Sequence, residues 1–219
     1  MGCGASSESQ HDSLEMYEME DEMEERVRRK HIQQTATQDT FLPPQEDAVS
    51  GKKTLVLDMD ETLLHSSPTE PEHFDFTVTV KKDVGEGKAT FWVLKRPGVD
   101  EFLAQMHEMY EIVIFTASTQ RYADAVLNAF SGSQYIHHRL YRQHCTSVQW
   151  RTVKDLGRLG RDLRGVIIVD DTPECYFLHP KNAFPIARFV DDMTDSELVG
   201  LADRLESVVD ASDVRKVAF

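Results

Sequence analysis

The feature that most constrains the fold is a short apolar run, Leu55 to Leu57, which ends at Asp58 and is followed closely by Asp60 and Thr62. Such a run predicts a buried strand of a parallel sheet. Open α/β sheets place their ligand sites at the carboxyl ends of such strands. Two acids and a hydroxyl at that edge suit phosphoryl transfer, because one carboxylate can attack phosphorus while the other protonates the departing oxygen.

The rest of the chain alternates between strand and helix patterns. A hairpin is expected over 74–80 and 90–94, because Gly85 and Gly87 lie between the two runs. Thr194 and Glu197 fit a capping box at the start of the last helix. The alternation predicts an α/β fold whose parallel sheet is covered on both faces, with the inserted hairpin over the site as a flap. The remaining elements are expected as strands at 54–58, 111–115, 138–141 and 165–169, and as helices at 99–108, at 119–130 and from about 195.

Composition narrows the possible partners. The 219 residues carry 24 Lys+Arg and 38 Asp+Glu, a net charge of −14, which argues against direct binding to nucleic acid. The three cysteines, Cys3, Cys145 and Cys175, have no paired spacing, so we expect neither a disulfide framework nor a zinc site. Cys145 and Cys175 are expected to be packed thiols. We expect no membrane-spanning helix and no secretory signal.

The first 50 residues are expected to form an acidic, flexible tail, and residues 51–219 the folded domain. The tail holds 12 acids and only 4 bases. Within it, residues 12–33 could form a helix, since Met16, Met19, Met23 and Val27 recur at helical spacing. Two interpretations remain open: a solvated helix or nascent disorder, or a docking helix whose methionines contact a partner.

Several further motifs lie between about residues 53 and 217. Taken together and in their order along the chain, they resemble the small C-terminal-domain phosphatases of the haloacid dehalogenase superfamily. The resemblance implies a Rossmann-like parallel sheet with a β-hairpin flap and no large cap domain. It also implies a protein serine/threonine phosphatase. The matching segments are Asp58–Ser67, Val93–Val99, Phe115–Ser118, Val153–Leu156, Arg158–Leu163 and Asp170–Pro173.

Within this resemblance, Asp58 is the expected nucleophile and Asp60 the general acid and base. Thr116 ends a predicted strand and can donate to phosphate, with Ser118 and Thr62 as further candidates. The resemblance also implies that Lys154 holds phosphate and the Asp58 carboxylate, and that Tyr122 and Arg142 line the peptide site.

A divalent cation is expected as well. Asp170 and Asp171 end a second predicted strand, and two facing acidic edges repel unless a cation lies between them. Oxygen ligands together with phosphate favour Mg²⁺. By resemblance the ligands are the Asp58 carboxylate, the Asp60 main-chain carbonyl and the Asp171 side chain.

Three positions depart from the small phosphatases. Asp171 stands where they usually carry asparagine, which adds a negative charge beside the expected metal. Pro68 and Thr119 stand where phenylalanine and leucine are common in the pocket that holds a substrate proline. The catalytic set therefore looks intact while the proline pocket looks altered, and we expect a phosphoserine or phosphothreonine protein as substrate without assigning the polymerase tail.

The amino terminus fits an acylation signal. Gly2 follows Met1 and small residues stand at positions 5 and 6, which is typical of N-myristoylation, and Cys3 is placed for palmitoylation. Two acyl chains would give stable anchoring. The leading hypothesis is thus a monomeric, Mg²⁺-dependent phosphatase on the cytosolic face of a plasma membrane or endomembrane. The alternatives are a soluble nuclear or cytoplasmic phosphatase of the RNA polymerase II tail and a non-catalytic, membrane-associated binding module.

Overall fold

The computed structural model describes residues 7–35, 39–82 and 85–217, with side chains described from residue 19 onward. Contacts divide the chain into two compact units, residues 1–38 and residues 39–219. The first unit contains helix α1 (Ser7–Thr35), which is longer than the expected helix over 12–33. Met19 and Met23 of its expected apolar stripe are 72% and 59% exposed.

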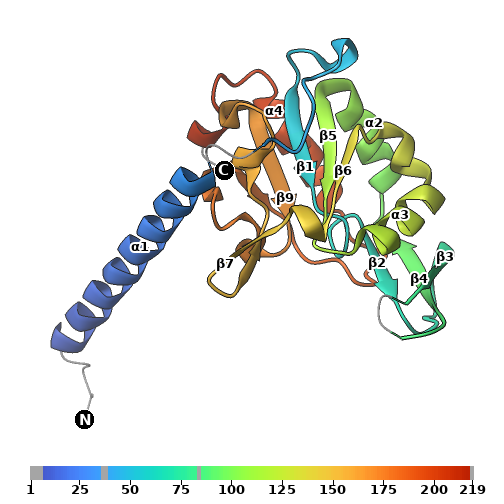
Figure 1. The fold of residues 1–219 in the computed structure, drawn as a ribbon, viewed down its shortest axis with the longest axis horizontal. Coiled ribbons are helices and arrows are strands. Elements are labelled where there is room, and N and C mark those ends of the chain that lie inside the picture. Colours follow the sequence, from blue (N-terminus) through green and yellow to red (C-terminus); the bar gives the residue numbers. More distant parts are fainter. Residues whose placement is uncertain (1–6, 36–38, 83–84, 218–219) are drawn as a thin grey trace. The chain divides into compact units, whose positions relative to one another are not determined.

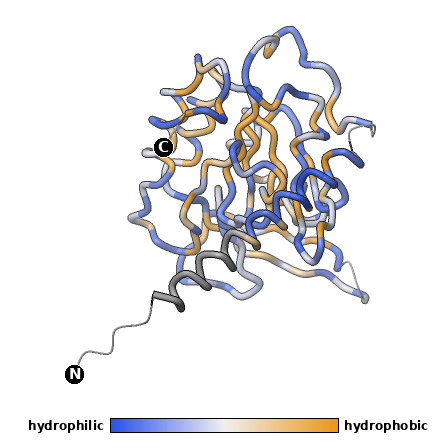
Figure 2. The backbone as a smooth tube through the Cα atoms, turned by 90° about the vertical axis from the view of Figure 1, so that its left-hand side faces the viewer, coloured by the Kyte–Doolittle hydropathy of each residue, from blue (hydrophilic) through white to orange (hydrophobic). Residues whose placement is uncertain are grey.

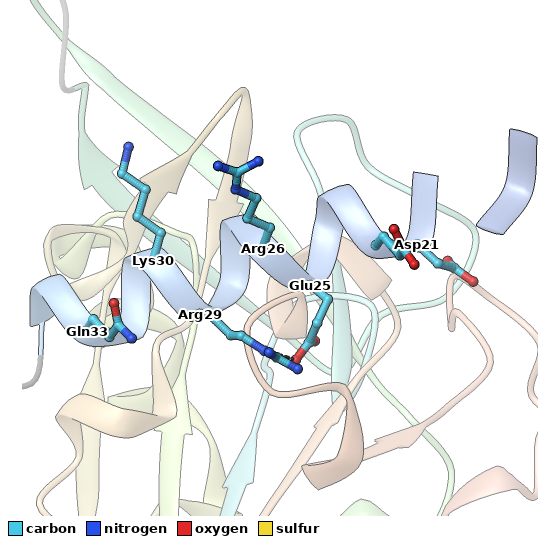
Figure 3. A pocket seen from close by; sticks show the side chains of 7 residues that line it. Asp21, Glu25, Arg26, Arg29, Lys30 and Gln33 are labelled. Carbon is cyan, nitrogen blue, oxygen red and sulfur yellow. Dashed lines mark hydrogen bonds and ion pairs between the residues drawn. The ribbon is translucent and has the colours of Figure 1, made fainter. Parts of the chain in front are cut away.

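A shallow hollow runs along α1. The residues that line it all come from this one helix, and Figure 3 shows acidic side chains toward one end and basic ones toward the other. Glu25 accepts from Arg29 Nε at 2.9 Å, one turn apart. An exposed pair of this kind stabilises a helix by only about 0.3–0.5 kcal/mol. The hollow is therefore the surface of a charged helix and not an enclosed site.

The second unit is built on a five-stranded sheet in the order β10-β9-β1-β5-β6, in which every neighbouring pair is parallel (Figure 1). The α/β fold expected from the sequence is therefore confirmed, with strand bounds that differ by one or two residues. Strand β10 was not expected. The strands are β1 (Lys53–Leu57), β5 (Tyr110–Phe115), β6 (His138–Leu140), β9 (Val166–Asp170) and β10 (Ala183–Pro185).

Alternate side chains of the central strands build two cores. Leu55 and Leu57 face one core, which also contains residues of helices α2 (Val99–Met109), α3 (Gln120–Ala129) and α4 (Glu197–Val208). Val56 faces the other core. Since both faces are buried, the strands read as continuous apolar runs, and Figure 2 shows these hydrophobic stretches gathered in the middle of the domain.

The second face of the sheet is covered by irregular chain and short turns instead of long helices. Leu42, Leu156 and Leu159 pack there against Val56 and its neighbours. Leu42 is 6% exposed, and the main-chain N–H of Phe41 donates to the carbonyl of Arg158 at 2.7 Å. The compact unit therefore begins at Asp39, earlier than the boundary we expected at residue 51.

A second sheet provides the flap. It is antiparallel, in the order β2-β4-β3, with β2 (Leu64–Ser67), β3 (Phe76–Lys81) and β4 (Lys88–Lys95). The expected hairpin is present as β3 and β4, whereas β2 was not predicted. A further hairpin, β7 (Thr146–Val148) and β8 (Arg151–Val153), was also missed and leads directly into Lys154.

The expected capping box at the last helix is wrong. Helix α4 begins at Glu197, and the Thr194 hydroxyl donates to Asp192 Oδ1 at 2.7 Å instead of capping the helix. Asp195 accepts the Glu197 N–H at 3.1 Å and also forms a bidentate ion pair with Arg96 at 2.8 and 2.7 Å. Arg96 is only 1% exposed, so its buried charge is balanced by this pair with Asp195.

Candidate active site

The candidate site lies at the carboxyl edge of the parallel sheet. Asp58 follows the central strand β1, which has β5 on one side and β9 on the other. Its main-chain N–H donates to the carbonyl of Val169 at 2.9 Å, and its side chain is buried. The adjacent strands end at Phe115 and Asp170, so three strand ends bring their following residues together, as predicted.

A buried lysine joins two of these strand ends. Lys154 Nζ lies 2.5 Å from Asp58 Oδ1 and 2.6 Å from Asp170 Oδ2. Burial alone would lower the pKa of Lys154, but the charges of Asp58 and Asp170 outweigh burial and raise it. The lysine is therefore protonated at neutral pH. We expected Lys154 to hold Asp58, but its pairing with Asp170 was not expected.

The backbone around Lys154 is fixed by buried polar contacts. Its N–H donates to the carbonyl of Cys175 at 2.7 Å. The next residue, Asp155, has Oδ1 at 2.9 Å from His179 Nε2 and accepts the Gly157 N–H at the same distance. Both Asp155 and His179 are buried. These contacts hold the turn after β8, so the ammonium group is preorganised at the sheet edge.

Asp60 is surrounded by hydroxyl groups. Tyr122 donates to its Oδ1 at 2.7 Å, while Ser118 and Thr116 donate to Oδ2 at 2.7 and 3.3 Å. Burial and then the charge of Asp58 raise the pKa of Asp60 to about 6, and the hydrogen bonds from Ser118 and Tyr122 oppose that rise. A carboxyl group with this pKa can give and take a proton near neutral pH.

The remaining candidates take positions that sequence analysis did not foresee. Ser118 and Thr116, expected to contact phosphate, contact Asp60 here, and so does Tyr122, expected at the peptide site. Arg142 lies at the rim, where its Nε donates to the carbonyl of Ala117 at 2.7 Å. The motif spacing alone does not show that these hydroxyls meet the carboxylate, because they belong to a different strand and helix.

Thr62 differs from its expected role. It was a further candidate to donate to phosphate, but here Oγ1 is buried and has no hydrogen-bond partner among the described residues. Its carbonyl oxygen instead accepts from Arg96 Nη1 at 3.0 Å. Thr62 therefore connects the loop after β1 to the buried Arg96 through a main-chain hydrogen bond.

Three carboxylates could hold a cation. Oxygens of Asp58, Asp170 and Asp171 lie within 4.8 Å of one another. Both oxygens of Asp170 are engaged, by Lys154 and by the Thr172 N–H at 2.9 Å. Asp171 has weaker partners: the Thr172 hydroxyl at 3.3 Å and Arg188 at 3.7 Å. Asp171 is therefore better placed to give an oxygen to a cation than Asp170.

The charges of this cluster also favour a cation. Burial and the charge of Asp58 raise the pKa of Asp171. Lys154 and the more distant, exposed Arg188 do not balance three carboxylates. Mg²⁺ binds through carboxylate oxygens while keeping several waters. The donor set therefore fits the magnesium ion that sequence analysis expected.

The two described cysteines are poor nucleophiles. Burial raises the pKa of the Cys145 thiol to about 11 and that of the Cys175 thiol to about 12. Both are free of disulfides. They agree with the expectation of packed thiols, and they leave Asp58 as the nucleophile candidate of this edge.

The candidate acylation residues, Gly2 and Cys3, lie outside the described residues. None of the described helices combines the length and the apolar character that crossing a bilayer requires.

Comparison with known proteins agrees with this geometry. The family model of the NLI interacting factor-like phosphatases matches residues 53–215. Phosphatase PSR1 of Saccharomyces cerevisiae is 41% identical over 180 residues, covering 81% of this chain and 42% of the relative. A human protein, carboxy-terminal domain RNA polymerase II polypeptide A small phosphatase 2, is 42% identical over 174 residues, covering 80% of this chain and 64% of the relative. The chain thus spans less than two thirds of the length of these relatives.

Solved structures support the same fold. The fission yeast RNA polymerase II CTD phosphatase Fcp1, bound to beryllium fluoride, superposes with a TM-score of 0.54 at 16% identity, over 75% of this chain and 53% of that one. The acidic edge, the lysine that bridges it and the family match over most of the domain lead to one conclusion. The chain belongs to the family of NLI interacting factor-like phosphatases, the small C-terminal-domain branch of the haloacid dehalogenase superfamily.

Proposed function

We propose that this chain is a Mg²⁺-dependent protein serine/threonine phosphatase that works through a phosphorylated Asp58. The observation that carries the proposal is the pairing of two unlike carboxyl groups at one strand end. Asp58 is ion-paired with Lys154 at 2.5 Å, while burial raises the pKa of Asp60 to about 6. Two neighbouring carboxyl groups with different protonation states are what nucleophilic and acid–base roles require.

The chemistry follows from these contacts. An oxygen of Asp58 attacks phosphorus while the bond to the substrate serine or threonine oxygen breaks, and Asp60 gives its proton to that oxygen. Asp60, now ionised, then takes a proton from water, which attacks the aspartyl-phosphate and releases phosphate and free Asp58. The Lys154 ammonium, fixed beside Asp58, stabilises the charge on the phosphoryl oxygens.

Mg²⁺ would be held by the carboxylates of Asp58 and Asp171 and by the Asp60 main-chain carbonyl. When bound, it supplies positive charge that counters the repulsion between Asp58 and the incoming phosphate. Thr116 and Ser118 can turn their hydroxyls from Asp60 to phosphate once substrate enters, because a hydroxyl rotates to suit its acceptor.

The substrate class rests on the open architecture and on the relatives. The flap is a three-stranded sheet, and the part of the chain that the structure describes contains no large cap domain over the edge. Such an edge admits a segment of another protein. The human relative is named for the carboxy-terminal domain of RNA polymerase II. With Pro68 and Thr119 in the expected proline pocket, we assign a phosphoserine or phosphothreonine protein and leave the polymerase as an alternative.

Hydrolysis of an aryl phosphate tests the enzyme assignment against the non-catalytic binding module. We expect phosphate release in the presence of MgCl₂ and a loss of roughly a hundredfold or more after EDTA treatment, because Mg²⁺ carries several kcal/mol of charge stabilisation. Restoring MgCl₂ should restore activity. Equal, near-background rates in all three conditions would favour the binding module.

The pH profile should depend on Tyr122. The general acid must be protonated, so kcat/KM for an aryl phosphate should fall as the pH rises through the pKa of Asp60, about 6. Tyr122 lowers that pKa by donating a hydrogen bond to the carboxylate. In Tyr122→Phe we therefore expect the alkaline limb to move up by about half to one pH unit. The profile is measured from pH 4 to 9. An alkaline limb at the same pH in wild type and Tyr122→Phe would contradict the proposed effect of Tyr122 on Asp60.

We further propose that acylation tethers the domain to the cytosolic face of a membrane. Gly2 and Cys3 supply the two attachment points that stable anchoring needs. The tether requires Gly2 to be the first residue after removal of Met1. Gly2→Ala should move the protein from the membrane fraction to the supernatant, with Ala5→Gly as the control, because it leaves the signal intact. Unchanged partition would favour the soluble nuclear or cytoplasmic alternative.

A further inference from the structure

The flap sheet has two faces, and each lies beside a different part of the site. Phe91 of β4 packs edge-on against Tyr122, with ring centroids 5.1 Å apart, and Tyr122 holds Asp60. Successive side chains of a strand point to opposite faces. Trp92 and Leu94 therefore face away from Tyr122, and the mechanism above does not use that second face.

The second face forms the wall of a pocket of about 420 Å³. His65 pairs with Leu94 across β2 and β4, and Ser67 pairs with Trp92, so these four side chains form one patch. Val190, from the segment before α4, also lines the pocket and is 40% exposed. An indole, a leucine and a valine give the pocket apolar walls suited to an alkyl chain.

The charged groups of the pocket are acidic. Glu72 and Asp191 line it, and both are exposed. No lysine or arginine lines it among the residues that the structure describes. Of its two histidines, His73 lies 3.8 Å from Glu72, and His65 Nδ1 lies 3.0 Å from Glu61 Oε1. Apolar walls with two unpaired or weakly paired carboxylates match a long side chain that ends in a cation.

The pocket is joined to the catalytic edge through Glu61. One oxygen of Glu61 lies beside His65, and the other lies 3.4 Å from Arg188. Arg188 also reaches Asp171, at 3.7 Å. The pocket therefore lies within a few side chains of the carboxylate cluster at Asp58 and Asp171.

We propose that this pocket binds the side chain of a lysine or arginine of the substrate protein, close in sequence to the phosphorylated residue. The inference rests on the proposed phosphatase function and deepens it by naming a specificity determinant. The alkyl stem packs on Leu94 and Val190, and the cation meets Asp191 and Glu72 and the face of Trp92. A cation on an indole face contributes about 0.5–1 kcal/mol at an exposed site.

Matched phosphoserine peptides test the proposal. One series carries lysine, norleucine or glutamate at each position within four residues of the phosphoserine, in an otherwise neutral peptide. We expect kcat/KM at one or two positions to be about five- to tenfold higher with lysine than with norleucine, and lowest with glutamate. In Asp191→Lys the preference for lysine should vanish or reverse, while the rate with an aryl phosphate stays unchanged.

Asp203→Lys is the matched control, since it makes the same charge reversal at an exposed acid on α4 outside the pocket. It should keep the wild-type preference. Equal rates with lysine and norleucine at every position would overturn the proposal, and so would an unchanged preference in Asp191→Lys. Rates that are highest with norleucine would show an apolar occupant instead, which also overturns it.

A binding readout separates this inference from the enzyme assignment. The chain has two tryptophans, so in Trp150→Phe the indole emission reports on Trp92. In Trp150→Phe/Asp58→Asn we expect the lysine peptide to change this emission at a concentration several-fold lower than the norleucine peptide. If neither the wild type nor any variant releases phosphate, the proposed function fails. The fluorescence titration alone then decides whether the pocket selects a basic side chain.

Discussion

Replacing Asp58 with asparagine should reduce kcat for aryl phosphate and phosphopeptide by a thousandfold or more, roughly the loss seen when other enzymes lose their nucleophile. In the unmutated chain Lys154 Nζ donates to Asp58 Oδ1 at 2.5 Å. The asparagine side chain has the same size and its amide oxygen can still accept this hydrogen bond, so the fold should be retained. What it loses is the carboxylate oxygen that we propose as the nucleophile toward phosphorus. The measurement is phosphate release at saturating Mg²⁺, with circular dichroism to show that the variant is folded.

The phosphoenzyme itself gives a sharper comparison. After rapid acid quenching, mass spectrometry should find one added phosphoryl group on Asp58 in wild type. Asp60→Asn should accumulate that adduct, because it lacks the base that activates water, whereas Asp58→Asn should form none. Turnover in Asp58→Asn close to that of wild type would disprove the covalent route.

Replacing Lys154 with alanine should have the largest effect on stability. Lys154 is fully buried and carries the only described ammonium between Asp58 and Asp170. Without Lys154, the buried carboxylates of Asp58 and Asp170 lie close to each other and to Asp171, and they lack this counter-ion. Breaking a buried ion pair by removing one partner costs about 3–5 kcal/mol. Urea denaturation at pH 7 in EDTA should show a loss of that size.

Two controls separate this effect from the loss of any lysine. Lys181→Ala removes an exposed lysine and should change the free energy of unfolding by less than about 0.5 kcal/mol. Adding Mg²⁺ should restore part of the stability of Lys154→Ala, because a cation bound to the native state counters the same charge. A loss below 1 kcal/mol in EDTA would mean that the carboxylates are not paired through Lys154.

The sequence allows the parallel sheet and its site edge to be predicted because their signals are local. Apolar runs that end in Asp58 and Asp170 mark strand ends, and parallel packing brings such ends together. Helices α2 and α3 begin and end within one residue of the bounds expected from the sequence. The capping pattern at Thr194 was misleading: the Thr194 hydroxyl bonds Asp192, and the neighbouring Asp195 pairs with Arg96, which lies far away in the sequence.

The contacts within the site could not be predicted in the same way. That Ser118 and Tyr122 hold Asp60 depends on how α3 packs against the loop after β1, and no spacing in the sequence encodes that distance. The short strands β2, β7, β8 and β10 were missed, since three or four residues give only a weak periodic signal. Strand β6 is equally short but was predicted. Leu42 was assigned to the tail because its role, covering one face of the sheet, is visible only once the sheet is built.

The high pKa values of Cys145 and Cys175 have a consequence for redox stress. At pH 7 a thiol with a pKa of 11 is ionised in only about one molecule in ten thousand, and the thiolate is the form that peroxide attacks. A carboxylate nucleophile has no comparable oxidation chemistry. A phosphatase of this design should therefore continue to remove phosphate during an oxidative burst that silences thiolate-based phosphatases in the same cell.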